Sequence, residues 1–268
     1  MDGQDPVIAF DPEIPSTARM YDYYLGGKDN YPADREAADE VMAMMPPEAI
    51  RTAARQNRMF LGRAVRYLAR QGIRQFLDIG TGLPTMGNVH EVAQEAAPGC
   101  SVVYVDHDPV VLAHGRDMLT GSRRTTIIGG DLRQPEAILA DHELRDQLDL
   151  TQPVAVLLIA VLHFIQDQED PAGIIGRLMG ALAPGSYLVI SHATADSHRE
   201  LDQAIQVYDS ATSSMHNRPR AHVQALFTGL DLIDPGVVWL PQWHPDPGTG
   251  LAEDPGRSLC WCGAARKP

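Results

Sequence analysis

The chain has 268 residues, 44% of them hydrophobic, and a formal net charge of −13. This length suits one α/β domain. The 35 acidic against 22 basic residues argue against a nucleic-acid partner, because such proteins neutralise phosphates with Lys and Arg. The longest apolar run, Val154 to Leu162, is far shorter than the roughly 20 residues that cross a bilayer, and the acidic N-terminus lacks the basic region of a signal peptide. We therefore expect a cytoplasmic protein with no membrane partner.

The N-terminal quarter of the chain predicts helices. Residues 19–31 combine four tyrosines with a pair of glycines. A helix is expected from Ala33 to Met45, where Pro46-Pro47 ends it. The helix after it carries an apolar stripe made of Phe60, Leu61, Ala64, Val65 and Leu68. We expect residues 1–70 to form a helical extension that packs on the core and acts as a lid.

From Phe76 onward, short apolar strands alternate with helices. Strands are predicted at 76–79, 102–105, 125–128, 154–159 and 187–191, and helices at 89–97, 110–119, 135–148 and 174–183. This alternation is typical of a parallel sheet covered on both faces. Residues 197–228 predict two helices that form a pocket wall. The last two strands, at 237–240 and 259–263, have no helix between them and should pair antiparallel. Residues 71–268 thus predict a Rossmann-like, doubly wound, mostly parallel sheet with an antiparallel C-terminal hairpin.

The segment most informative about function is Asp78-Ile79-Gly80-Thr81-Gly82, directly after the first of these strands. Glycines at this place let the backbone turn tightly and approach a ligand closely. Thr85 replaces the third glycine of the dinucleotide motif, and Asp78 stands where a dehydrogenase normally has an apolar residue. A carboxylate there suits a cationic ligand better than a pyrophosphate. S-adenosylmethionine (SAM), which carries a sulfonium and an ammonium group, is such a ligand.

Further acids follow the next two strands. Asp106 lies 24 residues beyond Gly82, where a carboxylate can accept hydrogen bonds from both ribose hydroxyls. Asp108-Pro109 is explained as the N-cap and first residue of a helix. In Gly130-Asp131-Leu132, the acid would face an adenine amino group and the leucine would cover the ring. A helix cap or a solvated loop explains any one of these acids equally well, but their places after successive strands favour one shared ligand.

The remaining candidates are less specific. Ala160, after the fourth strand, would let methyl donor and acceptor approach each other, and for the nearby His163 a packing or capping role is favoured over that of a general base. Tyr21, Tyr24 and Tyr31 offer flat faces with polar tips, so Tyr24 and Tyr31 join His163 as catalytic candidates. Arg58 or Arg19 would pair with the SAM carboxylate, although surface arginines are an equal explanation. The residues expected to contact the cofactor are Tyr21, Arg58, Asp78, Gly80, Thr81, Gly82, Asp106, His107, Gly130, Asp131, Leu132 and Ala160.

No metal or disulfide chemistry is expected. The ten histidines form no His-Glu-x-x-His pattern, and Cys260-x-Cys262 is one short pair within a predicted strand, without a second pair. With Cys100 these are the three cysteines of the chain, too few for a disulfide framework.

Together these segments resemble the class I SAM-dependent methyltransferases. The resemblance rests on Asp78-x-Gly80-x-Gly82, Asp106, Gly130-Asp131 and Pro184-Gly185, in that order. Residues 16–31, 54–58 and 263–268 narrow it to the bacterial S-adenosyl methyltransferase family long catalogued as a domain of unknown function. The resemblance implies SAM binding and a seven-stranded sheet with one antiparallel strand, and it names no acceptor.

We expect an in-line methyl transfer from SAM to a small-molecule acceptor. Holding donor and acceptor in line supplies roughly 7–11 kcal/mol through orientation alone, so no catalytic triad is required. Two alternatives stay open at this point. An NAD(P)-dependent oxidoreductase shares the glycine turn and Asp106, and a non-catalytic SAM-binding regulatory protein would keep the same cofactor site.

Overall fold

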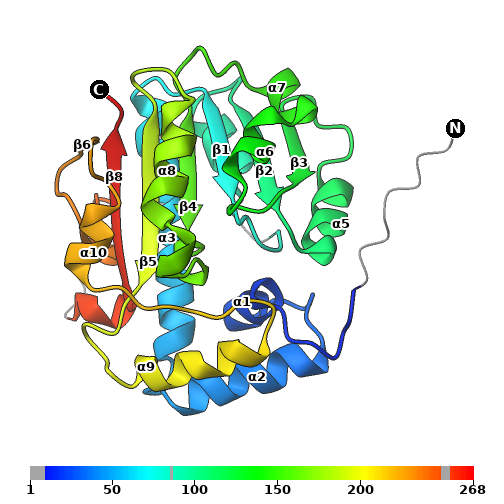
Figure 1. Ribbon diagram of the computed structural model, residues 1–268, viewed down its shortest axis with the longest axis vertical. Coiled ribbons are helices and arrows are strands. Elements are labelled where there is room, and N and C mark those ends of the chain that lie inside the picture. The colour runs from blue at the N-terminus through cyan, green and yellow to red at the C-terminus, as the bar shows by residue number, and fades with distance from the viewer. Residues whose placement is uncertain (1–9, 85–86, 249–253) are drawn as a thin grey trace, which may run out of the picture.

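The structure, a computed structural model, describes residues 10–84, 87–248 and 254–268, so Thr85 lies outside the described residues. Its centre is a sheet with the strand order β3-β2-β1-β4-β5-β8-β6, and β7 also pairs with β8 (Figure 1). The parallel strands are β1 (Gln75–Ile79), β2 (Ser101–Asp106), β3 (Thr125–Gly129), β4 (Ala155–Ile159) and β5 (Tyr187–Ala193). The antiparallel strands are β6 (Asp231–Leu232), β7 (Val238–Trp239) and β8 (Cys260–Arg266).

The predicted doubly wound sheet and its antiparallel C-terminal strands are confirmed, but the sheet has eight strands where seven were expected. The two-residue strands β6 and β7 pair with the same strand, β8. Between them, the Ile233 N–H donates to the Ala264 carbonyl at 2.9 Å. They are thus one edge strand interrupted near Pro235, which has no N–H to offer a ladder.

Helices cover both faces of the sheet. α3 (Ala49–Arg70), α4 (Val89–Ala96) and α5 (Pro109–Met118) pack on one face, where their apolar side chains meet Phe76 and Val102. α6 (Pro135–Ala140), α7 (His142–Gln147), α8 (Pro171–Gly180) and α10 (Arg220–Ala225) pack on the other face against Leu77 and Val103. Because both faces are buried, the strands are continuous apolar runs.

Two predicted helices differ in detail from the observed ones. The helix expected over 135–148 is broken at Asp141, whose carboxylate accepts from the Leu144 N–H at 3.1 Å and so begins a new helix, α7. The helices expected over 197–228 are shorter. The first is α9 (Leu201–Ala204), which continues into the 3-10 turn η3 (Ile205–Ser210). A nine-residue stretch without helix, 211–219, then separates it from the second, α10.

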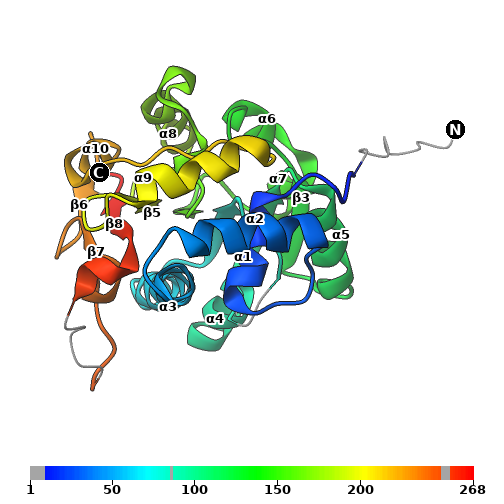
Figure 2. The same cartoon turned by 90° about the horizontal axis from the view of Figure 1, so that it is seen from below.

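The two remaining N-terminal helices lie, together with one later helix, beneath the carboxyl ends of the parallel strands. Figure 1 shows α1 (Thr17–Leu25), α2 (Pro32–Ala43) and α9 there, and Figure 2 shows α2 and α9 side by side across this end. They share an apolar cluster that includes Met20, Val41 and Ala204. We call α1, α2, α9 and η3 the lid helices.

Candidate active site

The turn after β1 requires glycine at both of its predicted positions. Gly80 and Gly82 have φ values of +75° and +67°, in the region that side chains disfavour. A Cβ on Gly80 would lie 2.4 Å from Cγ2 of Val161. The Gly80 N–H donates to the Val105 carbonyl at 2.8 Å. The turn therefore places bare backbone, with no side chain, at the carboxyl end of β1.

Asp78 and Arg58 put opposite charges at this end of the sheet. The Asp78 side chain is 4% exposed, and burial raises its pKa to about 6, partly offset by the positive charge of Arg58. Arg58 extends from α3, and its Nη2 donates to the Gly87 carbonyl at 3.2 Å. Its buried Nε has no hydrogen-bond partner among the described residues. An acidic side chain beside an arginine with a free hydrogen-bond donor matches a ligand that carries an ammonium and a carboxylate.

Asp106 is held rigidly at the end of β2. One carboxylate oxygen accepts from the Gly82 N–H at 2.9 Å, and the other accepts from the His107 and Asp108 N–H groups at 2.7 and 2.9 Å. Burial raises the pKa of Asp106, while the backbone hydrogen bonds lower it. The carboxylate is thus tied to the glycine turn, and it retains lone pairs for a ligand hydroxyl.

The segment after β3 supplies a third side of the site. A Cβ on Gly130 would lie 2.9 Å from side-chain atoms of Val105 and Ile138, so the backbone packs closely here. The Asp131 carboxylate accepts from the Arg133 N–H at 2.9 Å and from its guanidinium at 3.3 Å. Arg133 was not predicted from the sequence, because no local motif identifies an arginine that orients the acidic side chain two residues before it. Leu132 is 5% exposed.

A chain of hydrogen bonds connects the end of β4 to the lid helices. Ala160 has a φ of +54°, and its N–H donates to Ser191 Oγ at 2.9 Å. Ser191 Oγ donates to Asn57 Oδ1 at 2.6 Å, and Asn57 Nδ2 donates to the Tyr21 hydroxyl at 3.0 Å. The Tyr21 hydroxyl donates to the Ala54 carbonyl at 3.2 Å. This relay fixes Tyr21 against the site, and its members Ser191 and Asn57 were not anticipated.

His163 lies in a buried position at the edge of the site. It is 5% exposed, and burial, with His192 and Arg218 nearby, holds its pKa well below the usual range. Its Nδ1 accepts from the Ala193 N–H at 3.4 Å, and its ring lies against Phe164 at a centroid distance of 4.4 Å. His163 is therefore a neutral imidazole and a weak base.

Two of the sequence candidates lie elsewhere. Tyr31 is 37% exposed, and its ring packs against Phe10 and the Arg19 guanidinium. Arg19 is 2% exposed and forms an ion pair with Asp34 at 3.1 Å. Both hold the N-terminal helices together, and neither lines the cavity described below.

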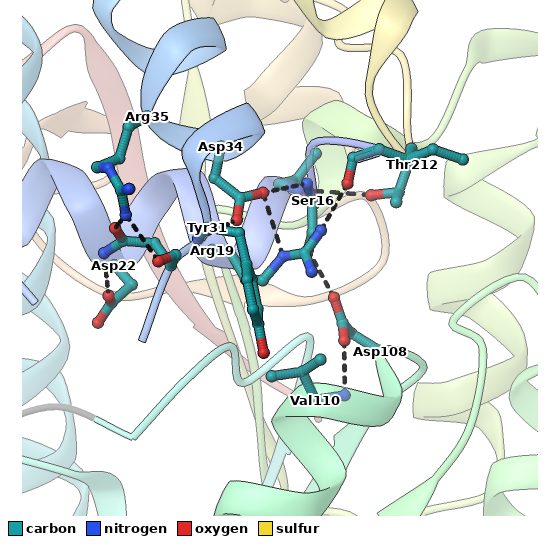
Figure 3. Close-up of polar contacts among 12 residues, drawn as sticks. Ser16, Arg19, Asp22, Tyr31, Asp34, Arg35, Asp108, Val110 and Thr212 are labelled. Atoms are coloured by element: carbon teal, nitrogen blue, oxygen red, sulfur yellow. Dashed lines mark hydrogen bonds and ion pairs between the residues drawn. The ribbon is translucent and has the colours of Figure 1, made fainter. Parts of the chain in front are cut away.

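The segment that leads into α1 and includes its first residue, residues 14–17, crosses from the lid to the cofactor side (Figure 3). Ser16 Oγ donates to the Asp108 carboxylate at 2.5 Å, and the Ser16 N–H donates to Asp34 at 2.8 Å. On the other side, the Thr212 N–H donates to the Pro15 carbonyl at 3.0 Å. Asp108 also caps α5 by accepting from the Val110 N–H at 2.8 Å, as predicted. We call residues 14–17 the strap.

One cavity gathers these features. All twelve residues expected to contact the cofactor line it, together with Tyr24 and His163. The lid helices and the strap form the wall opposite the carboxyl ends of the strands. Within residues 10–84, 87–248 and 254–268, no group of three or more His, Cys, Asp or Glu side chains is placed to hold a metal ion.

A doubly wound sheet with a glycine turn and an acid at the ends of β1 and β2 defines a nucleoside-binding α/β protein of the methyltransferase type. Residues 4–268 match the model of the S-adenosyl methyltransferase family. The chain therefore belongs to this family, and it is a SAM-dependent methyltransferase.

Solved structures agree with the family assignment. A DUF574 family protein from Streptomyces avermitilis MA-4680 is 44% identical with a TM-score of 0.91, covering 96% of this chain and 99% of its own. A candidate methyltransferase from Thermobifida fusca YX is 37% identical with a TM-score of 0.91, covering 98% of each chain. An O-methyltransferase family protein from Burkholderia thailandensis, 14% identical with a TM-score of 0.54 over 81% of this chain and 60% of its own, shares the fold alone.

Two further findings bear on the expectations from sequence. No curated protein matches the chain, so no acceptor comes from a close relative. Among the helices of the described ranges, none has both the length and the apolar character needed to cross a membrane.

Proposed function

We propose that this methyltransferase acts on a small-molecule acceptor bound inside the cavity, with SAM held at the carboxyl ends of β1 to β4. The single observation that carries this proposal is that all twelve candidate cofactor residues line one cavity, eleven of them outside the lid helices and Tyr21 on α1. A cavity partly covered by the lid helices favours a small acceptor over a nucleic acid, and so does the net charge of −13.

Each group has a distinct role in this proposal. The Asp106 carboxylate binds the ribose hydroxyls, and Asp131 with Leu132 holds the adenine. Asp78 pairs with the ammonium of the methionine part, and Arg58 pairs with its carboxylate. The unpartnered Nε of Arg58 and the open space beside Gly82, where a Cβ would meet nothing within 4 Å, support this fit, because they leave a free donor and accessible backbone at the cavity.

When bound, SAM supplies a methyl group already activated by the positive sulfonium. The chain contributes orientation and the exclusion of water. The strap and lid helices cover the site. The turn at Ala160 keeps the space at the carboxyl end of β4 free of a large side chain. His163 is too weak a base to carry a proton away, so we propose that it packs beneath the acceptor without a catalytic role.

The chain divides in this proposal at residue 70, as the sequence suggested. Residues 1–70 are the helical extension, of which α1 and α2 are the lid while α3 has joined the helices on the sheet. Residues 71–268 bind the cofactor. A cytoplasmic location belongs to the same proposal.

The ribose assignment is tested at Asp106. Asp106→Asn should weaken SAM binding at least tenfold, because a carboxylate-to-hydroxyl hydrogen bond is worth roughly 1.5–3 kcal/mol. Calorimetric titration with SAM, S-adenosylhomocysteine and NAD measures this, and NAD should not bind. Asp117→Ala, which removes an exposed acid from α5, is the matched control and should bind SAM normally. An unchanged dissociation constant for Asp106→Asn would contradict the assignment.

A further inference from the structure

The cavity has two chemically different halves. Its Asp, Arg and exposed His side chains come from the ends of β1 to β3 and from Arg58 of α3. The lid helices and the residues packed on them form the other half, which we call the acceptor half. Its side chains are mainly apolar or aromatic, and those that matter here are Tyr24, Val41, Ala53, Phe164, Leu201 and Tyr208. Of the described residues that line this half, none is a Lys, Arg, Asp or Glu.

A buried pair of tyrosine hydroxyls lies within this mainly apolar wall. The hydroxyls of Tyr24 and Tyr208 lie 3.0 Å apart, and the two side chains are 4% and 8% exposed. Burial raises the pKa of Tyr208 to about 12 and that of Tyr24 well above its usual value, so both stay protonated.

The tyrosine pair has a spare hydrogen-bond donor. Two O–H groups share one mutual hydrogen bond, and only one of the two protons is used in it. No other side-chain hydrogen bond is made by either hydroxyl within the described part of the chain. A buried donor left unpaired costs roughly 1–3 kcal/mol. The spare O–H is therefore available to a ligand oxygen inside the acceptor half.

The charge of the wall limits which acceptors can react. Methyl transfer from a sulfonium to a neutral amine leaves a cation on the acceptor, and an apolar wall without a carboxylate disfavours that charge. Transfer to an anionic oxygen instead joins a positive and a negative group and leaves two neutral products. Such a reaction is favoured in surroundings of low dielectric constant.

Resting on the methyl transfer proposed above, we propose that the acceptor half binds a flat aromatic molecule that reacts through an acidic phenol or enol hydroxyl. A second oxygen of this molecule accepts a hydrogen bond from the Tyr24–Tyr208 pair. The hydroxyl gives its proton to water before transfer. Its oxygen lone pair then forms the new C–O bond, the C–S bond breaks, and its electron pair stays on sulfur. The products are a neutral methyl ether and S-adenosylhomocysteine.

The test uses the full chain and two probes of similar size. The first, 2-hydroxy-1,4-naphthoquinone, has an acidic enol and carbonyl oxygens, and the second, 2-naphthylmethylamine, is cationic. Binding to the protein saturated with S-adenosylhomocysteine is measured by calorimetry, and transfer is measured with methyl-labelled SAM. The hydroxyquinone should bind and be methylated on oxygen, and the amine should do neither.

Variants of the tyrosine pair test the donor. Tyr208→Phe should weaken hydroxyquinone binding about tenfold, as expected for one lost hydrogen bond, with SAM binding unchanged. The control is Tyr23→Phe, on the same helix as Tyr24, because the Tyr23 hydroxyl contacts Asp39 at the surface. It should leave both affinities unchanged, and unchanged SAM binding in all variants shows that they fold.

The outcomes separate this inference from the proposed function. If SAM binds but the amine is methylated, or the hydroxyquinone fails to bind, the inference is overturned and the methyltransferase function stands. Equal hydroxyquinone affinity in Tyr208→Phe also overturns it. If SAM itself does not bind, the proposed function falls, and this inference falls with it.

Discussion

Burial of ionisable side chains in the site lowers the stability of the folded protein, and Asp78 shows this most directly. Its carboxyl is 4% exposed, and burial raises its pKa from the ordinary 3.8 to about 6. The fold thus disfavours the charged form, which is the form that would bind an ammonium group. Charged groups placed in costly surroundings are typical of functional sites.

The raised pKa of Asp78 predicts how stability depends on pH. Between pH 3.8 and about 6 the folded state holds a proton that the unfolded state has lost, so this group makes the free protein less stable as pH rises through that window. Asp78→Asn removes the effect and should stabilise the free protein at pH 8 by at most about 3 kcal/mol, while it weakens SAM binding. Urea unfolding at pH 4 and pH 8, with calorimetry for SAM, checks both. Equal destabilisation at the two pH values would contradict the charge argument.

At the scale of elements, the strap holds the lid to the cofactor side. Ser16 Oγ bonds the Asp108 carboxylate, whose other oxygen caps α5 (Figure 3). Asp108 also lies two residues after Asp106, which accepts its N–H. A single short loop therefore carries the acid proposed to bind the ribose, the helix cap and the anchor of the lid. A bound nucleoside and a closed strap should support each other.

The strap contact predicts a change in cofactor release. Ser16→Ala removes the bond to Asp108 and keeps the backbone bond from Ser16 to Asp34. S-adenosylhomocysteine should dissociate about 10- to 150-fold faster, since a hydrogen bond to a charged group is worth roughly 1.5–3 kcal/mol. Stopped-flow displacement by excess SAM measures this rate. Thr126→Ala is the control, because it also breaks a hydroxyl–carboxylate bond, to Glu143, but outside the cavity. An unchanged rate in Ser16→Ala would show that the strap does not retain the cofactor.

The elements themselves were largely predictable from local patterns. The five parallel strands are apolar runs, and caps such as Asp108-Pro109 obey rules of local sequence. Residues joined only by the fold were not predictable. Ser191 and Asn57 are 134 residues apart, yet they share the relay beneath Ala160. Likewise, nothing near Tyr24 indicates that its partner is Tyr208, because side-chain pairing across helices leaves no local pattern.

At the scale of the whole molecule, the cavity lies between two bodies with different sources of stability. The sheet and its covering helices have two large apolar clusters of their own. The lid helices depend on a smaller cluster, which includes Met20, Val41 and Leu201, and on the contacts of the strap. Regions with fewer buried apolar contacts open more readily. The lid should therefore open while the sheet stays intact.

This difference in stability predicts which helices cofactor binding protects from amide hydrogen exchange. In the proposed site, S-adenosylhomocysteine would fill the space between the sheet and the lid, so it should slow amide hydrogen exchange in α1 and α2 more than in α8, which packs on the sheet away from the cavity. Exchange is followed by mass spectrometry with and without the cofactor product. Asp106→Asn, which should bind it poorly, is the control and should show little protection at the same concentration. If protection were confined to the turn after β1 and left α1 and α2 unchanged, the lid helices would be a fixed wall, and cofactor exchange would need another opening.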